Sequence, residues 1–543
     1  MSIFNRMSVS YSIRILSFIF TLVGHCAAQP AWDDDLYLTP EKTNFEKTST
    51  YADVIKFLSI QASRTKDMRV ISMGKSPEGK DIPVAIVARP MVNSADEAKK
   101  SGKLIVYIQG NIHAGEVEGK EVVMQQIRDL VNNPNRSTIL DKLIILFVPI
   151  YNTDSNDKMA FGRRPTQDNS PPEVGLRENS QGLDLNRDGV KMEANETNCL
   201  FKIINEWDPQ LFVDLHTTNG SWHGWDLTWA PSYHYAGDAG PYEFTVFMLQ
   251  TITGKVYEDK GLKFGPYGDY YMSEGWPARN FYTYNHHPRY LVNQFGLRNR
   301  MAILSEAFSH ESFSERIFST NAFVTQILNY AAEYSGEIAR INREADQRTI
   351  QQAGTNVEKG VRFKMVANDV LFNMPSYDYE MDPETKRYRP TRNRITLDSI
   401  NYYGGFEATV STTFPSGYMI PKTMKTIVDN LKKHGIKVDE LKRSRNLSGE
   451  VFEIEKYETG QRAFEGHQMA TATGKYVKKR KKFKRGDYLV DLAQPLGNLA
   501  FYLLEPQSDD GLLTWNFFDD SIEKEKKDSD PMEYPVFRYY TTK

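Results

Sequence analysis

Cysteine is nearly absent from this chain of 543 residues, which contains only Cys26 and Cys199. Two cysteines allow a single intramolecular disulfide, and loss of an N-terminal segment with Cys26 would leave none. The folded chain must therefore be stabilised by its hydrophobic core, which a protein of this length can build.

Excess charge and long apolar runs are also missing. The 67 Lys and Arg residues are balanced by 70 Asp and Glu residues, for a net charge of -3. This balance gives no indication of nucleic acid or an anionic membrane as the main partner. Beyond the N-terminus, no run approaches the roughly 20 apolar residues of a transmembrane helix. We expect no nucleic-acid partner, and no membrane span once the N-terminal segment is removed.

The N-terminus has the pattern of an export signal. Arg6 and Arg14 precede ILSFIFTLVG, an apolar stretch of roughly ten residues. Small residues follow at Cys26 and Ala28, as a cleavage site requires. We predict that residues 1–28 are a signal peptide and that the mature chain is periplasmic or extracellular. An uncleaved membrane anchor is the alternative.

Residues 29–352 alternate short apolar runs with segments of helical spacing. The runs KLIVYIQ, KLIILFVPIY, LFVDLH and MAILSEAF are typical of buried strands, and the helical pattern VEGKEVVMQQIRDLV follows the first of them. This order predicts an α/β domain with a mixed, mostly parallel central sheet flanked by helices. A helix-like segment from 321 to 352 would end the domain.

Residues 353–543 have a different pattern, with short strand-like runs, many turn signals and one amphipathic helix that stops at Gly435. We predict a smaller β-rich accessory domain there, whose role the sequence leaves open. The basic run KYVKKRKKFKR, residues 475–485, lies between predicted strands. Because the chain as a whole is not basic, a solvated hairpin is favoured over a nucleic-acid site.

A candidate metal site begins in the stretch GNIHAGEVEGKE. His113 and Glu116 have the spacing of two ligands one turn apart. The pair alone is not specific, because about one such match is expected by chance in this composition. His216 ends the run LFVDLH, and ligand sites in open α/β sheets form at the carboxyl ends of strands. The alternative for His216 is a residue that merely caps its strand.

The chain resembles the zinc carboxypeptidases of the funnelin family, as a divergent exported member of bacterial type. The resemblance rests on the order and spacing of several motifs within roughly residues 45–340. They are His113-x-x-Glu116, NTDSN from Asn152, GLDLNRD from Gly182, DLHTTNG around His216 and AILSEAF around Glu306. As a set these motifs are specific, and the resemblance implies the family's α/β fold.

The resemblance also implies a metal centre with one Zn²⁺ ion per chain. His113, Glu116 and His216 match the family's zinc ligands. Asp184 matches the carboxylate that orients the first histidine and makes it a better ligand.

The remaining roles are likewise implied by the resemblance. Asn186 and Arg187 match the pair that holds the terminal carboxylate of the substrate, for which a guanidinium is well suited. Either Arg163 or Arg164 would polarise the scissile carbonyl, and either Tyr284 or Tyr290 would close over the substrate. Both choices stay open.

Glu306 matches the family's catalytic glutamate, the general base for a zinc-activated water molecule. The alternative is a structural ion pair with Arg298 or Arg300. His286 and His287, in the stretch YTYNHHPRY, are interpreted as polar loop residues rather than ligands.

The resemblance thus implies an exported zinc metallopeptidase that releases C-terminal residues, a metallocarboxypeptidase. Its substrate would be a peptide or peptide-like molecule with a free carboxylate. One alternative is a zinc-dependent amidase or deacylase of the same fold, acting on cell-wall peptides or acyl-amino acids. Another is a non-catalytic peptide-binding protein, although all three ligands and Glu306 are present. The preferred side chain, its L or D configuration and the oligomeric state stay open.

Overall fold

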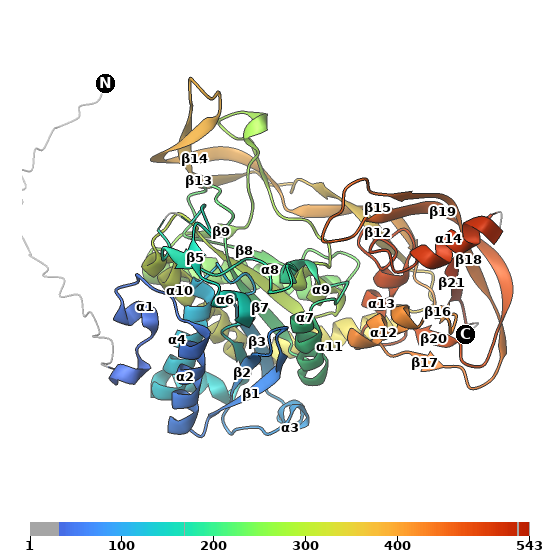
Figure 1. Cartoon of the computed structure of the whole chain (residues 1–543), viewed down its shortest axis with the longest axis horizontal. Helices are drawn as coiled ribbons and strands as arrows, with labels where there is room; N and C mark the ends of the chain where they lie inside the picture. Colours follow the sequence, from blue (N-terminus) through green and yellow to red (C-terminus); the bar gives the residue numbers. More distant parts are fainter. Residues whose placement is uncertain (1–31, 168, 529–530, 542–543) are drawn as a thin grey trace, which may run out of the picture.

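The computed structural model describes residues 32–167, 169–528 and 531–541 (Figure 1). The predicted signal peptide, residues 1–28, lies outside these residues. Within the described ranges, every helix is too short or too polar to cross a bilayer.

An eight-stranded mixed sheet forms the centre of the first part of the chain, with the strand order β1-β2-β4-β3-β7-β11-β8-β9. The strands are β1 Met68–Lys75, β2 Asp81–Val87, β3 Leu104–Gly110, β4 Leu143–Val148, β7 Leu211–Thr217, β8 Leu227–Pro231, β9 Phe264–Pro266 and β11 Met301–Ala307. The inner strands β4, β3, β7 and β11 run parallel, whereas β2 and β8 run antiparallel to their inner neighbours. The predicted α/β class with a mixed, mostly parallel sheet is confirmed.

Helices cover both faces of this sheet, as Figure 1 shows. One face packs against α2 Tyr51–Arg64, α4 Glu118–Asn132, α8 Ala239–Lys260, α10 Phe313–Glu333 and α11 Ser335–Gln352. The other packs against α3 Ala95–Lys100, α7 Asn195–Trp207 and α9 Leu291–Leu297. Along β3, Val106 and Ile108 enter the first core while Ile105 and Tyr107 enter the second. Strands buried on both faces explain the continuous apolar runs.

The expected helix from 321 to 352 is two helices. The chain leaves helical geometry at Tyr334, between α10 and α11. Ser335 and Gly336 follow the break, and both residue types are poor helix formers.

Shorter elements connect the main ones. They are η1 Asp34–Leu36, α1 Thr39–Lys42, α5 Pro134–Ser137, η2 Thr138–Asp141, α6 Thr153–Asn156, β5 Ala160–Phe161, β6 Glu173–Val174, η3 Leu185–Arg187, η4 Met272–Glu274 and β10 Asn280–Tyr282.

The C-terminal part is rich in strands and has its own core. Its six-stranded sheet has the order β17-β20-β16-β21-β18-β19. The strands are β16 Gly417–Ile420, β17 Asp439–Glu440, β18 Arg445–Thr459, β19 Ala470–Phe483, β20 Tyr488–Asp491 and β21 Met532–Tyr539, with helices α12 Lys425–Lys433, α13 Gly497–Leu504 and α14 Asp519–Asp528. The predicted amphipathic helix is α12, and the chain turns with positive φ at Gly435.

Two strand pairs link the parts. β12 Glu358–Val366 pairs with β15 Gly405–Thr413, and β13 Phe372–Met381 pairs with β14 Tyr388–Tyr403. β14 also pairs in parallel with β10 of the first part. The chain after 352 therefore returns to the first part, and the division into 29–352 and 353–543 stays a prediction.

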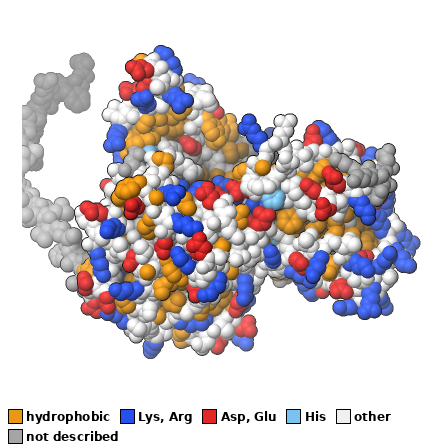
Figure 2. Space-filling view, in the orientation of Figure 1, with side chains coloured by type: hydrophobic (Ala, Val, Ile, Leu, Met, Phe, Trp, Pro, Cys, Tyr) orange, Lys and Arg blue, Asp and Glu red, His pale blue; other side chains and the backbone are white. Residues whose placement is uncertain are grey.

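The basic run belongs to the hairpin of β18 and β19. Lys478, Arg480 and Lys482 are exposed, whereas Lys479 and Lys481 pair with Glu533. Basic side chains gather over this end of the molecule (Figure 2). Charge on an edge strand prevents pairing with other chains, as the solvated-hairpin interpretation requires.

Candidate metal and catalytic site

Three adjacent strands bring the candidate residues together. β3, β7 and β11 are neighbours, so the loop after β3 lies beside the carboxyl ends of the other two. That loop carries His113. His216 of β7 and Glu306 of β11 are partners in the parallel register, so they lie side by side. The candidates thus converge at the carboxyl ends of the parallel strands, where ligand sites in α/β sheets form.

The loop after β3 depends on residues without bulk. A Cβ on Gly110 would lie 2.6 Å from the carbonyl carbon of Gly119, and one on Gly119 would lie 2.8 Å from Cβ of Leu215. Only glycine allows the strand and α4 to approach so closely. Asn111 turns the chain with φ of 67°, a conformation that asparagine tolerates better than most residues.

His113, Glu116 and His216 form one buried cluster, each between 2% and 3% exposed. Their donor atoms lie within 4.8 Å of one another. Nδ1 of His113 is 2.9 Å from Oε1 of Glu116, and Nδ1 of His216 is 3.0 Å from Oε2. Two imidazole nitrogens around a carboxylate are a donor set that zinc prefers, so the residues fit that ion.

A carboxylate lies behind each histidine. Oδ1 of Asp184 is 3.1 Å from Nε2 of His113. Oδ2 of Asp214 is 3.1 Å from Nε2 of His216. Each carboxylate favours the tautomer that leaves Nδ1 free for an ion. Burial lowers the pKa of His216, but Asp214 and Glu116 outweigh this effect and raise it overall.

The surroundings shift the pKa values of Glu116 and Glu306 in opposite directions. Burial alone would raise the pKa of Glu116, but His113 and Arg164 hold it well below its usual range. Burial, with the nearby Glu116 carboxylate, raises the pKa of Glu306. Glu116 is thus kept as an anion, while Glu306 is able to accept and release a proton near neutral pH.

We expect Asp214→Asn to weaken zinc binding by roughly 10–100-fold, because loss of an outer carboxylate has that typical effect. The substitution keeps the shape of the side chain, so the fold should survive. Competition with a chelator of known affinity measures the change. Asp259→Asn on α8 is the matched control and should bind zinc like the wild type. Unchanged affinity in Asp214→Asn would show that His216 needs no such partner.

The sequence leaves Arg163 and Arg164 as candidates for the arginine that polarises the scissile carbonyl, but neither lines the pocket. Arg163 is exposed and is absent from the residues that line the pocket. Arg164 lies 3.0 Å from Oε1 of Glu116, with its side chain 9% exposed, so it holds a ligand rather than facing the pocket. Arg177 does line the pocket, and it contacts Asp184 at 3.0 Å and Nδ1 of His113 at 3.3 Å. Arg177 is therefore better placed to meet a substrate.

Asn186 and Arg187 both line the pocket. Asp184 caps η3 by accepting from the backbone N–H of Asn186, and the side-chain oxygen of Asn186 accepts from the N–H of Leu291. The guanidinium of Arg187 lies 4.5 Å from the centre of the Tyr290 ring. This contact orients the guanidinium at the pocket wall.

Tyr284 and Tyr290 also line the pocket, so the structure does not separate these two candidates. The hydroxyl of Tyr284 donates to the side-chain oxygen of Asn293. The two tyrosine rings meet edge to face with centres 5.2 Å apart.

Glu306 is 8% exposed and lies in the pocket, and within the described part of the chain it forms no ion pair with Arg298 or Arg300. Arg300 pairs with Asp208 and Asp346 instead. Its neighbour Arg298 donates to the carbonyl of His434. The structural ion-pair alternative for Glu306 therefore finds no support.

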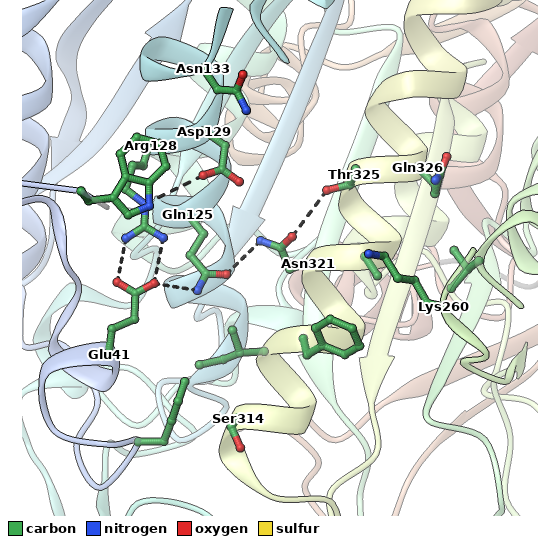
Figure 3. A pocket seen from close by; sticks show the side chains of 16 residues that line it. Glu41, Gln125, Arg128, Asp129, Asn133, Lys260, Ser314, Asn321, Thr325 and Gln326 are labelled. Atoms are coloured by element: carbon green, nitrogen blue, oxygen red, sulfur yellow. Dashed lines mark hydrogen bonds and ion pairs between the residues drawn. The ribbon is translucent and has the colours of Figure 1, made fainter. Parts of the chain in front are cut away.

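The pocket itself is small, with a volume of about 50 Å³. Besides the polar candidates, it is lined by Tyr267, Val292 and Leu304. A larger cavity of about 440 Å³ lies between α4 and α10 (Figure 3). Among the residues that line it, the carboxylate of Glu41 accepts hydrogen bonds from Arg128 and Gln125. No histidine lines that cavity in the described chain, so it lacks the imidazole donors of the smaller pocket.

Sequence analysis does not identify three residues of the site, two that line the pocket (Arg177 and Tyr267) and one behind His216 (Asp214). Arg177 stands in a loop without regular structure, Asp214 reads as a break in an apolar run, and Tyr267 is one of 30 tyrosines. A signal exists for Asp214, because it precedes His216 by two residues on a strand, and residues two apart on a strand share one face. Pairing Arg177 with the metal ligands requires the three-dimensional fold.

Comparison with known proteins gives a consistent result. The sequence profile of the zinc carboxypeptidase family matches residues 55–236. Carboxypeptidase 2 of Trichophyton equinum is 23% identical over 488 residues, which cover 86% of this chain and 81% of the relative. Carboxypeptidase D of Rattus norvegicus is 28% identical over 133 residues, which cover 22% of this chain and 10% of the relative. The match to Trichophyton is too long to be confined to residues 29–352.

Two solved structures with a partial similarity are titled metallo-carboxypeptidases. A metallo-carboxypeptidase from Burkholderia cenocepacia is 14% identical, with a TM-score of 0.40, over 53% of this chain and 70% of its own. One from Pseudomonas aeruginosa, in complex with (2-guanidinoethylmercapto)succinic acid, is 15% identical, with a TM-score of 0.39, over 54% and 70%.

Proposed function

We propose that this chain, which carries a zinc carboxypeptidase domain, is an exported zinc metallopeptidase that removes single residues from the free C-terminus of peptides. The observation that carries the proposal is the placement of the ligand cluster, Glu306 and Arg187 around one pocket. Export rests on the signal pattern of residues 1–28 alone.

The side chains divide the work of hydrolysis. Zinc held by the cluster would act as a Lewis acid that polarises water and a carbonyl group. Glu306 takes a proton from the attacking water and passes it to the nitrogen of the leaving residue. The N–H groups of Arg177 donate to the carbonyl oxygen, where negative charge develops.

Arg187 supports the choice of a terminal carboxylate. A guanidinium binds both oxygens of a carboxylate in a fixed fork, which gives orientation as well as affinity. Val292 and Leu304 line the same pocket, together with three tyrosines. Among the described residues, the carboxylates that line this pocket are those of Glu116 and Glu306, so we expect uncharged C-terminal side chains to be preferred over basic ones.

A mixed peptide pool tests the proposal. Each peptide is supplied with a free and with an amidated C-terminus, incubated with the zinc-loaded mature chain, and analysed by mass spectrometry. We expect loss of single C-terminal residues from the free peptides alone, with uncharged residues lost fastest.

Other outcomes would redirect the proposal. Cleavage of both forms would mean that no group reads a terminal carboxylate, and would favour an endopeptidase or amidase. Turnover of acyl-amino acids or cell-wall fragments, without cleavage of peptides, would establish the deacylase or amidase alternative. Stoichiometric peptide binding without turnover would leave a binding protein.

A further inference from the structure

A second cluster of metal-binding side chains lies where the two parts of the chain meet. His286 and His287 belong to the loop between β10 and α9, and Asp509 follows α13. One donor atom of each residue lies within 4.8 Å of the other two. The sequence alone favours polar loop residues for these histidines, and the fold brings Asp509, 223 residues away from His286, next to them.

The spacing of these donors suits an ion. Nε2 of His286 is 3.1 Å from Oδ2 of Asp509 and 3.3 Å from Oδ1. Ligand atoms bonded to tetrahedral zinc at about 2.0–2.1 Å lie about 3.3 Å apart. The corresponding distances in the pocket cluster are 2.9 Å and 3.0 Å. The His286–Asp509 pair thus has a spacing similar to that of the pocket pairs, and a donor atom of His287 lies within 4.8 Å of both residues.

Asp509 is held in place by groups of the C-terminal part. The backbone N–H of Phe363 donates to Oδ2 at 2.9 Å, and the hydroxyl of Tyr502 donates to Oδ1. Carboxylates that bind metals are commonly supported by such hydrogen bonds, which fix their direction. The carboxylate is therefore already oriented toward the two histidines.

His286 supplies an independent observation. Its side chain is 2% exposed, and its Nδ1, the ring nitrogen that does not contact Asp509, has no hydrogen-bond partner within the described ranges. A buried polar atom without a partner calls for a water molecule or an ion nearby. His287 is partly exposed, which leaves access from solvent.

We propose that His286, His287 and Asp509 bind a second zinc ion, separate from the pocket cluster, with water completing its coordination. Two imidazoles and one carboxylate are borderline donors that favour zinc over calcium or magnesium. The ion would join the loop that carries Tyr284 and Tyr290 to the C-terminal part. Its role is structural, and it fixes one wall of the pocket.

The metal content of the purified mature chain tests this site. After zinc loading and dialysis, elemental analysis should find about two zinc ions per chain in the wild type and about one in His287→Ala. His113→Ala should also retain about one, held at the junction, and the double variant should retain essentially none. Only one ion in the wild type, or equal content in wild type and His287→Ala, would overturn the proposal.

Thermal unfolding gives a second readout that does not depend on activity. In the His113→Ala background, added Zn²⁺ should still raise Tm, because an ion that binds only the folded chain stabilises it. The additional replacement Asp509→Asn should abolish this shift. A shift that persists in Asp509→Asn would place the ion elsewhere. Failure of peptide cleavage would leave both measurements unaffected, so this site and the proposed function are tested separately.

Discussion

Replacement of Glu306 by glutamine is expected to lower kcat by roughly 10²–10⁴-fold, the usual contribution of a general base. The amide has nearly the same shape as the carboxylate but is not able to accept the proton of the attacking water. Glu306 is outside the ligand cluster, so zinc content should stay at the wild-type level. Steady-state kinetics on a free C-terminal peptide, with elemental analysis of the same sample, measures both quantities.

Glu384→Gln is the matched control, because it makes the same change on the exposed β13–β14 hairpin. This variant should keep wild-type kinetics and zinc. If Glu306→Gln retained more than about a tenth of wild-type kcat, another group would have to act as the base. Loss of zinc together with activity would instead assign Glu306 a role in binding the ion.

Much of the pocket could be predicted because its metal-binding and catalytic side chains lie at or just after the ends of strands. Continuous apolar runs identify β3, β7 and β11 as buried strands, and His113, His216 and Glu306 stand at or just after their carboxyl ends. The carboxyl ends of neighbouring parallel strands lie on the same side of the sheet, so the topology alone brings these three residues together. The fold class rests on the same regular pattern of strands and helices.

The remaining contacts depend on loops that no local pattern specifies. Arg164 and Arg177 reach Glu116 from the long connection after α6, whose path is fixed by tertiary packing. From the sequence, adjacent Arg163 and Arg164 are equivalent, yet one is exposed and the other is buried against a ligand. The cluster of His286, His287 and Asp509 could not be predicted either, because tertiary packing brings its distant segments together.

The C-terminal part supports the segments that would hold substrate. The carbonyl of Val190, three residues after Arg187, accepts from Asn430, and His434 contacts it at 3.2 Å. Arg289, next to Tyr290, pairs with Asp510 at 2.7 Å. Residues beyond 352 therefore hold the chain near Arg187 and the residue next to Tyr290. This explains in physical terms why a peptidase part would keep such a partner.

Arg187→Met should reduce kcat/KM for peptides with a free C-terminus by on the order of 10²–10³-fold, because truncating one partner of a largely buried charge pair costs about 2–5 kcal/mol. Amidated peptides, which offer no carboxylate, should lose little, so the preference for the free form should collapse. Arg187→Lys is the informative control. Lysine keeps the charge but lacks the planar fork and its stacking on Tyr290, so it should recover only part of the loss. Full activity of Arg187→Met on free peptides would transfer the carboxylate contact to Arg177, the other arginine at the pocket.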